Sequence, residues 1–180
     1  MKTVQTDVAI IGAGTAGLNA RKEVIKAGRK AFLIESGPYG TTCARVGCMP
    51  SKLLIAAADR AHEIETAPLF GMTAGSVNID GAAVLKRVRN ERDRFAGFVV
   101  SDTEAIPEEE RACGHARFTA PTTLQIDDAI QVNANAVVVA AGSSPWLPPP
   151  FDAIRSASVS TVEKRNRSTI CSSGLTSARN

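Results

Sequence analysis

The chain has 180 residues, of which 44% are hydrophobic and 22% charged, with a net charge of +3. These values are ordinary for a soluble globular protein, and the length suits one domain, or one domain and a tail. Basic residues are scattered through stretches of mixed sign, so we expect no nucleic-acid partner. No hydrophobic run reaches membrane-spanning length and no signal-peptide core opens the chain, so we expect no membrane association and a cytoplasmic location.

The first 35 residues predict a compact strand–turn–helix–strand unit. A strand at 8–11 ends in a glycine-rich turn, and a helix at 16–27 follows and stops at Gly28. A second strand at 31–34 is closed by Glu35. This order is typical of a parallel sheet, so we expect an α/β fold.

The middle of the chain predicts helices. One begins near residue 46 and continues to about 64, and residues 67–75 form a loop. Asp80 is a plausible N-cap for a long amphipathic helix that continues to about residue 100.

After Pro107 the pattern predicts short strands at 114–118, 123–126, 130–132 and 136–140. The last is uniformly apolar, as expected of a strand buried on both faces. We therefore expect one domain over 1–150, with a small antiparallel β-meander beside the parallel sheet. The serine- and threonine-rich remainder, 151–180, predicts a disordered or poorly packed tail.

The glycine-rich turn has the spacing Gly12-x-Gly14-x-x-Gly17. The first glycine permits a tight exit from the strand, the second lets the backbone approach a pyrophosphate, and the third lets helix and strand pack closely. Glu35 lies 18 positions past Gly17, where a carboxylate would accept the hydroxyls of an adenosine ribose. A glutamate there favours FAD or NAD over NADP. The alternative is a strand–helix turn without a ligand.

Cys43 and Cys48 lie five positions apart, close to a predicted helix start. As a redox dithiol, the pair would have its thiolate favoured by the helix dipole and by nearby Arg45 and Lys52. As a metal site it lacks a second pair of ligands at a plausible spacing. As ordinary core cysteines, the two would need no relation to the glycine turn.

The other candidate groups are weaker. His62 and His115 have no carboxylate partner at a telling spacing, so a satisfied or exposed histidine is the simpler interpretation. Cys113 and Cys171 are isolated, and we expect them to be inert. We therefore expect no metal site.

These motifs together resemble the N-terminal part of the pyridine nucleotide–disulfide oxidoreductases, flavoproteins that include dihydrolipoamide dehydrogenase, mercuric reductase and glutathione reductase. The resemblance rests on 12–17, Glu35 and 42–52, and it extends through 114–118 and 140–145. The resemblance covers about 1–150 and is strongest to dihydrolipoamide dehydrogenase. The implied fold is a truncated Rossmann-like FAD-binding domain.

The resemblance also implies roles for single residues. Cys43 would be the interchange thiol that meets a small-molecule or lipoyl-type dithiol or disulfide, and Cys48 would be the charge-transfer thiol against the flavin. Glu35 would bind the ribose of FAD. The implied cofactor-binding residues are Gly12, Gly14, Gly17, Glu35, Thr42 near the pyrophosphate, Lys52 near flavin N5, and Ala116 and Gly142 through their backbones.

The chain departs from the family pattern at Thr41, where a second glycine is usual, and at Ala141, where threonine is usual. It contains no second glycine fingerprint for NAD and no C-terminal His–Glu pair. The part that forms the family's homodimer interface is also missing. We therefore expect this chain alone to turn over poorly.

Two other functions are compatible with the sequence. One is a small non-enzymatic dinucleotide-binding protein or thiol redox sensor. The other is an inactive gene remnant, with a frameshifted tail after about Arg155, because the composition changes abruptly there.

Overall fold

The computed structural model describes residues 1–143, so the predictions for the 151–180 tail and for the domain boundary near residue 150 lie outside the described residues. The chain divides into two compact units. One combines residues 1–39 with the described residues from 103 onward, and the other comprises residues 40–102. Each unit is described by itself.

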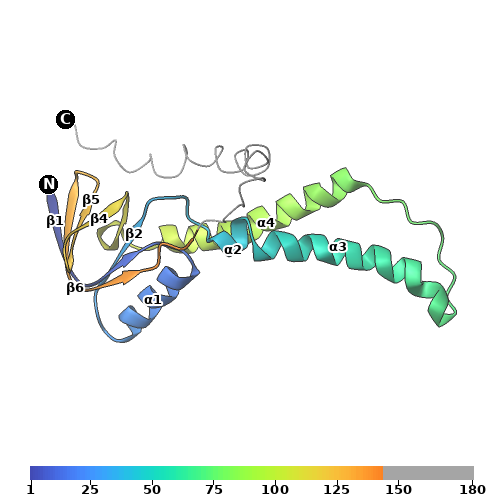
Figure 1. Cartoon of the computed structure of the whole chain (residues 1–180), viewed down its shortest axis with the longest axis horizontal. Coiled ribbons are helices and arrows are strands. Elements are labelled where there is room, and N and C mark those ends of the chain that lie inside the picture. Colours follow the sequence, from blue (N-terminus) through green and yellow to red (C-terminus); the bar gives the residue numbers. More distant parts are fainter. Residues whose placement is uncertain (144–180) are drawn as a thin grey trace, which may run out of the picture. The chain divides into compact units, whose positions relative to one another are not determined.

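The first unit is built on one mixed sheet of six strands (Figure 1). The strands are β1 (Lys2–Ile11), β2 (Ala31–Glu35), β3 (Arg111–Cys113), β4 (Ala116–Ala120), β5 (Thr123–Ile126) and β6 (Ile130–Val139). Their order in the sheet is β3-β2-β1-β6-β5-β4. The four strands from β3 to β6 in that order are parallel neighbours, whereas β4, β5 and β6 pair antiparallel. The predicted parallel sheet with an antiparallel meander is confirmed, and the two parts share β6.

The long pairing of β1 with β6 corrects two predicted strand boundaries. We expected separate strands at 130–132 and 136–140, but β6 is continuous from Ile130 to Val139. Because β1 begins at Lys2 rather than near residue 8, it pairs with β6 along its whole length, from Lys2 opposite Ile130 to Ile11 opposite Val139. The ladder supplies partners that hold residues 133–135, Asn-Ala-Asn, extended.

The start of the meander is also divided differently from the prediction. The strand expected at 114–118 is β4, shifted to begin at Ala116, and β3 before it, which pairs with β2, was not predicted. Gly114 and His115 carry the chain from one pairing to the other.

Buried side chains lie on both faces of the sheet, since Ile10 and Leu33 alternate along their strands with Ala9, Phe32 and Ile34. The largest cluster lies on the second of these faces. It joins buried side chains from the parallel strands to others from the meander: Ala9, Phe32, Ile34, Ala112, Leu124, Ile126 and Val132. The carboxyl end of β6 departs from expectation, because Val139 is 65% exposed rather than buried on both faces. Within the described part of this unit, no element covers it at that point.

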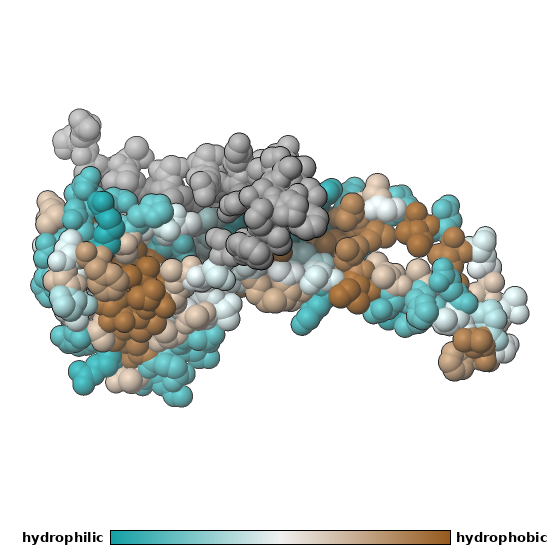
Figure 2. Space-filling model, viewed as in Figure 1, coloured by the Kyte–Doolittle hydropathy of each residue, from teal (hydrophilic) through white to brown (hydrophobic). Residues whose placement is uncertain are grey.

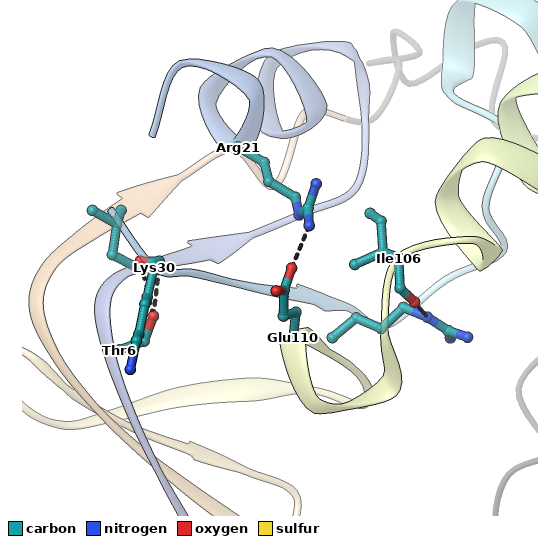
Figure 3. Close-up of polar contacts among 7 residues, drawn as sticks. Thr6, Arg21, Lys30, Ile106 and Glu110 are labelled. Atoms are coloured by element: carbon teal, nitrogen blue, oxygen red, sulfur yellow. Dashed lines mark hydrogen bonds and ion pairs between the residues drawn. The ribbon is translucent and has the colours of Figure 1, made fainter. Parts of the chain in front are cut away.

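Helix α1 (Thr15–Lys26) lies along the sheet in Figure 1. It ends at Ala27, and Gly28 follows with φ +70°, donating its N–H to the carbonyl of Ile25. The predicted stop at Gly28 is therefore confirmed. An ion pair between Arg21 of α1 and Glu110 holds the helix to the short 3-10 helix η2 (Glu108–Glu110) (Figure 3).

Two further hydrogen bonds drawn in Figure 3 join side chains to backbone carbonyls of neighbouring segments in this unit. The Thr6 hydroxyl donates to the Lys30 carbonyl at 3.0 Å, and the Arg111 guanidinium donates to the Ile106 carbonyl at 2.8 Å. The second contact fixes the turn that leads into β3.

The second unit is helical. Its elements are α2 (Thr42–Arg45), α3 (Cys48–Thr66), the 3-10 helix η1 (Ala67–Phe70) and α4 (Gly81–Glu104), whose last two residues belong to the first unit. The helix predicted from about residue 46 to 64 is confirmed as α3, and the short helix α2 before it was not predicted. Asp80 caps α4 as predicted, because its carboxylate accepts a hydrogen bond from the Ala83 N–H at 3.0 Å.

This unit has little core of its own, since no residue of α3 is buried. Figure 2 shows hydrophobic side chains on its surface, and Leu69 and Phe70 of η1 are 82% and 76% exposed. None of the helices among residues 1–143 combines the length and the hydropathy needed to cross a membrane.

Candidate functional site

The glycine turn joins β1 to α1 at the carboxyl end of the sheet. Gly12 has φ +107°, and its N–H donates to the Ile34 carbonyl at 2.7 Å. A methyl group on Gly12 would lie 2.3 Å from the carbonyl oxygen of Ala140, just past the end of β6. A methyl group on Gly17 would lie 1.8 Å from the carbonyl oxygen of Gly12. Both glycines are therefore required by close packing of the backbone.

Gly14 differs from its two neighbours. A methyl group there would meet nothing within 4 Å, so its side-chain position faces open space. Gly14 is also the N-cap of α1, and no side chain caps this helix end. Free backbone N–H groups at a helix N-terminus attract an anionic group such as a phosphate. The turn therefore has the open, donor-rich surface that a pyrophosphate requires.

Glu35 ends β2 and binds the glycine turn directly. One carboxylate oxygen accepts a hydrogen bond from the Ala13 N–H and the other from the Gly37 N–H, both at 2.7 Å. Each carboxylate oxygen has a second lone pair, so both can also accept from a ribose hydroxyl. The sequence did not reveal the contacts of Ala13 and Gly37, because backbone donors carry no side-chain signal.

The two later predicted flavin-contacting segments also reach this edge of the sheet. The Gly114 N–H donates to the Glu35 carbonyl at 2.9 Å, and Ala116 opens β4 two residues later. Gly142 lies two residues past Ala140, whose N–H donates to the Ile11 carbonyl at 2.8 Å. The three glycines of the turn, Glu35 and Gly142 thus lie where parallel strands end, which is the usual place for a nucleotide ligand in such sheets, whereas Ala116 pairs with Ile126 in the meander.

Cys113 is not isolated, although the sequence suggested that it was. It lies opposite Glu35 in the β2–β3 pairing, and its sulfur is 3.3 Å from the hydroxyl of Tyr39. Tyr39 is buried, and this burial, with the Cys113 hydrogen bond, raises its pKa above the ordinary value while Arg111 opposes the shift. Tyr39 gave no sequence signal, because a single tyrosine in a loop has no periodicity.

The predicted redox cysteines lie in the second unit on two different helices. Cys43 is the second residue of the one-turn helix α2, and Cys48 is the first residue of α3. Both are free thiols, and their side chains are joined by a hydrogen bond. The structure therefore brings together the two sulfurs that the spacing had paired.

The electrostatic prediction for this pair is wrong for Cys43. Its pKa is raised above the ordinary value, first because Cys48 hydrogen-bonds the thiol and second because of desolvation. Lys52 lowers this pKa as expected, but its effect is outweighed. Arg45 is not among the causes, and its Cδ would lie 3.0 Å from a methyl group on Gly40. The contact with Cys48 thus favours the protonated form of Cys43.

The other two predicted residues of this unit flank the pair. Thr42 is the exposed first residue of α2, and its carbonyl accepts from the Val46 N–H at 3.0 Å. Lys52 lies four residues after Cys48 in α3, and therefore on the same helix face. Among residues 1–143, no three His, Cys, Asp or Glu side chains are grouped as a metal site requires.

The architecture of the first unit defines a class of protein. After β1 comes a glycine turn that packs against the end of β6, and the carboxylate of Glu35, at the end of β2, accepts a hydrogen bond from this turn. This arrangement is a Rossmann-like nucleotide-binding fold of the FAD-binding type.

Comparison with protein families identifies the group within this class. The family described as pyridine nucleotide-disulphide oxidoreductase matches residues 6–170, and the chain belongs to this family of FAD-dependent oxidoreductases. Similar proteins include a mercuric reductase from Lysinibacillus sphaericus, 29% identical over 79% of this chain. A dihydrolipoyl dehydrogenase from Chlamydia muridarum is 32% identical over 77% of the chain, and a mycothione reductase from Mycobacterium tuberculosis is 32% identical over 79%.

The chain spans 26%, 30% and 32% of the lengths of these three relatives. Among solved structures, the copper(II) complex of the HOCl-induced flavoprotein disulfide reductase RclA from Escherichia coli is similar in fold. It aligns with a TM-score of 0.59 at 22% identity, over 81% of this chain and 30% of that one.

Proposed function

We propose that this chain is the FAD-binding portion of a dithiol–disulfide oxidoreductase of the dihydrolipoamide dehydrogenase type. In this function Cys43 and Cys48 exchange electrons between a small-molecule or lipoyl-type dithiol and FAD, and then NAD. The hydrogen-bonded pair of free thiols in a member of this family is the observation that carries the proposal.

The residues of the first unit suit FAD. The open position at Gly14 and the uncapped start of α1 would receive the pyrophosphate, and Glu35 would accept from the ribose hydroxyls. Ala116 and Gly142 would contribute backbone contacts. When bound, FAD supplies a two-electron acceptor for the reduced thiol pair.

The thiol chemistry belongs to the chain itself. With the pair as a disulfide, a substrate thiolate attacks the Cys43 sulfur, breaks the Cys43–Cys48 bond and releases the Cys48 thiolate. The second substrate thiol, once deprotonated, attacks the substrate sulfur of the mixed disulfide and displaces Cys43. The substrate leaves as a disulfide, so its two electrons have passed to the pair. Afterwards Cys43 keeps its proton, because its raised pKa favours the thiol, with its S–H donating to the Cys48 sulfur.

Two measurements on the purified chain test this proposal. We expect one FAD to bind per chain, measured by quenching of flavin fluorescence. We also expect oxidised lipoamide to produce a Cys43–Cys48 disulfide, identified by alkylation and peptide mass spectrometry, and dihydrolipoamide to reverse it. The Cys43→Ser variant is the matched control, because it retains the glycine turn and should still bind FAD. A chain that binds no FAD and forms no such disulfide contradicts the proposal.

A further inference from the structure

Thr41 has a backbone conformation that its residue type disfavours. Its φ is +56° and its ψ is +148°, outside the small left-handed region that L residues tolerate. Branching at the β carbon makes this conformation more costly for threonine than for most residues. The other non-glycine residue with positive φ among residues 1–143 is Asp127, with φ +44°, and aspartate tolerates that region better.

The side chain of Thr41 accounts for its presence. Its hydroxyl oxygen accepts a hydrogen bond from the Ala44 N–H at 3.3 Å and so caps α2. Its carbonyl accepts from the Arg45 N–H at 3.1 Å. A glycine would adopt the same φ without strain but would have no hydroxyl to offer.

Helix α2 depends strongly on this cap because it is only four residues long. The other helical hydrogen bond at its start joins the Val46 N–H to the Thr42 carbonyl at 3.0 Å. So short a helix does not persist through its own propensity. The cap therefore contributes a large share of the hydrogen bonding that keeps this turn formed.

The helical turn of α2 also sets the distance between the Cys43 and Cys48 thiols. Cys43 lies within α2, and Cys48 begins α3 after only Val46 and Gly47. That link folds back on the turn, because a methyl group on Gly47 would lie 3.3 Å from the Thr42 carbonyl oxygen. Fraying of α2 would therefore let Cys43 move away from Cys48.

We propose that Thr41 is a positioning residue for the Cys43–Cys48 pair, holding the first turn of α2 through its side-chain cap at the expense of backbone strain. This inference rests on the proposed redox role of the two cysteines. The raised pKa of Cys43 agrees with it, since that shift requires the two thiols to be in contact.

The test measures the equilibrium between the dithiol and the disulfide in the full chain. The protein is equilibrated with glutathione, trapped by alkylation and analysed by mass spectrometry. In this reaction the two thiols and one oxidised glutathione give the Cys43–Cys48 disulfide and two reduced glutathione molecules. We expect Thr41→Ser to match the wild type within about twofold, because serine is also a good N-cap. We expect Thr41→Ala to lower the equilibrium constant about fivefold, the effect of a typical lost cap.

Thr41→Gly separates positioning from general stability. Glycine relieves the strained φ, so this variant should unfold at a higher urea concentration than Thr41→Ala. It lacks the hydroxyl but is a tolerated N-cap, so its disulfide equilibrium constant should fall below that of the wild type by less than that of Thr41→Ala. If the alanine and glycine variants match the wild type, or if serine fails to preserve the equilibrium, the inference is wrong. A wild-type chain that forms no Cys43–Cys48 disulfide would overturn both this inference and the proposed function.

Discussion

Replacing Gly17 by alanine tests whether the glycine turn is held by backbone packing. The added methyl group would lie 1.8 Å from the Gly12 carbonyl oxygen, and real contacts of this kind are not shorter than 3.0 Å. The next nearest atom is the Gly12 carbonyl carbon, at 3.0 Å. Both of these atoms belong to the backbone, so neither can rotate away as a flexible side chain could. Helix α1 must therefore move away from β1.

Overpacking of this kind costs about 1–3 kcal/mol, and the movement would also disturb the contact of α1 with Ile10. Alanine is a better helix former than glycine by about 1 kcal/mol, which offsets part of the cost. We expect a net loss of about 1 kcal/mol in the free energy of unfolding. FAD affinity should fall as well, because the same movement displaces the N-terminus of α1.

Gly14→Ala is the matched control, since its methyl group would meet nothing within 4 Å and its φ of −78° suits alanine. Its free energy of unfolding should stay within about 0.5 kcal/mol of the wild type. Its affinity for FAD should fall about tenfold or more, because the methyl group occupies the space assigned to the pyrophosphate. Urea unfolding and fluorescence titration with FAD give the two quantities. If Gly17→Ala is as stable as Gly14→Ala, the packing argument fails.

Three other substitutions address the polar groups. Glu35→Gln should cost about 1–3 kcal/mol of stability and weaken FAD binding about tenfold, because the amide nitrogen cannot accept from one of its two backbone donors; unchanged FAD titrations would argue against a ribose contact. Cys48→Ala should lower the pKa of Cys43, whose shift comes first from the Cys48 hydrogen bond, so alkylation of Cys43 should begin at a lower pH; an unmoved pH profile would contradict this. Tyr39 has a raised pKa when folded, so its stabilising effect should be complete below its ordinary value of 10.0 and be lost as the pH rises beyond it. Urea unfolding of the wild type should therefore weaken above that pH more steeply than that of Tyr39→Phe, and equal slopes would refute the assignment.

The fold was predictable where local signals were strong. The glycine turn, the stop at Gly28 and the cap at Asp80 lie where the sequence placed them, because each depends on neighbouring residues alone. The strand boundaries were wrong where pairing decides them. Residues 2–7 and 133–135 are mostly polar and contain no apolar run, so their extended conformation depends on the ladder between them.

The candidate site shows the same division. The spacing of Cys43 and Cys48 was sufficient to pair them, because five residues of chain keep the sulfurs close. The direction of the Cys43 pKa shift was not predictable, because it depends on a hydrogen bond between side chains of two helices. The contact between Tyr39 and Cys113 joins residues 74 positions apart, so no local sequence pattern could predict it.

The register of the sheet has a consequence for how this chain is made. β1 lies beside β6 at the centre of the sheet, and their ladder runs from Lys2 opposite Ile130 to Ile11 opposite Val139. During synthesis, β1 can therefore complete its pairing only after β6, the last described strand, has left the ribosome. Until then, β1 and β2 form only a partial sheet with one side of β1 unpaired, a state open to premature association. The nascent chain thus acquires its nucleotide-binding edge in a single late step, when Ala140 comes to rest beside Gly12.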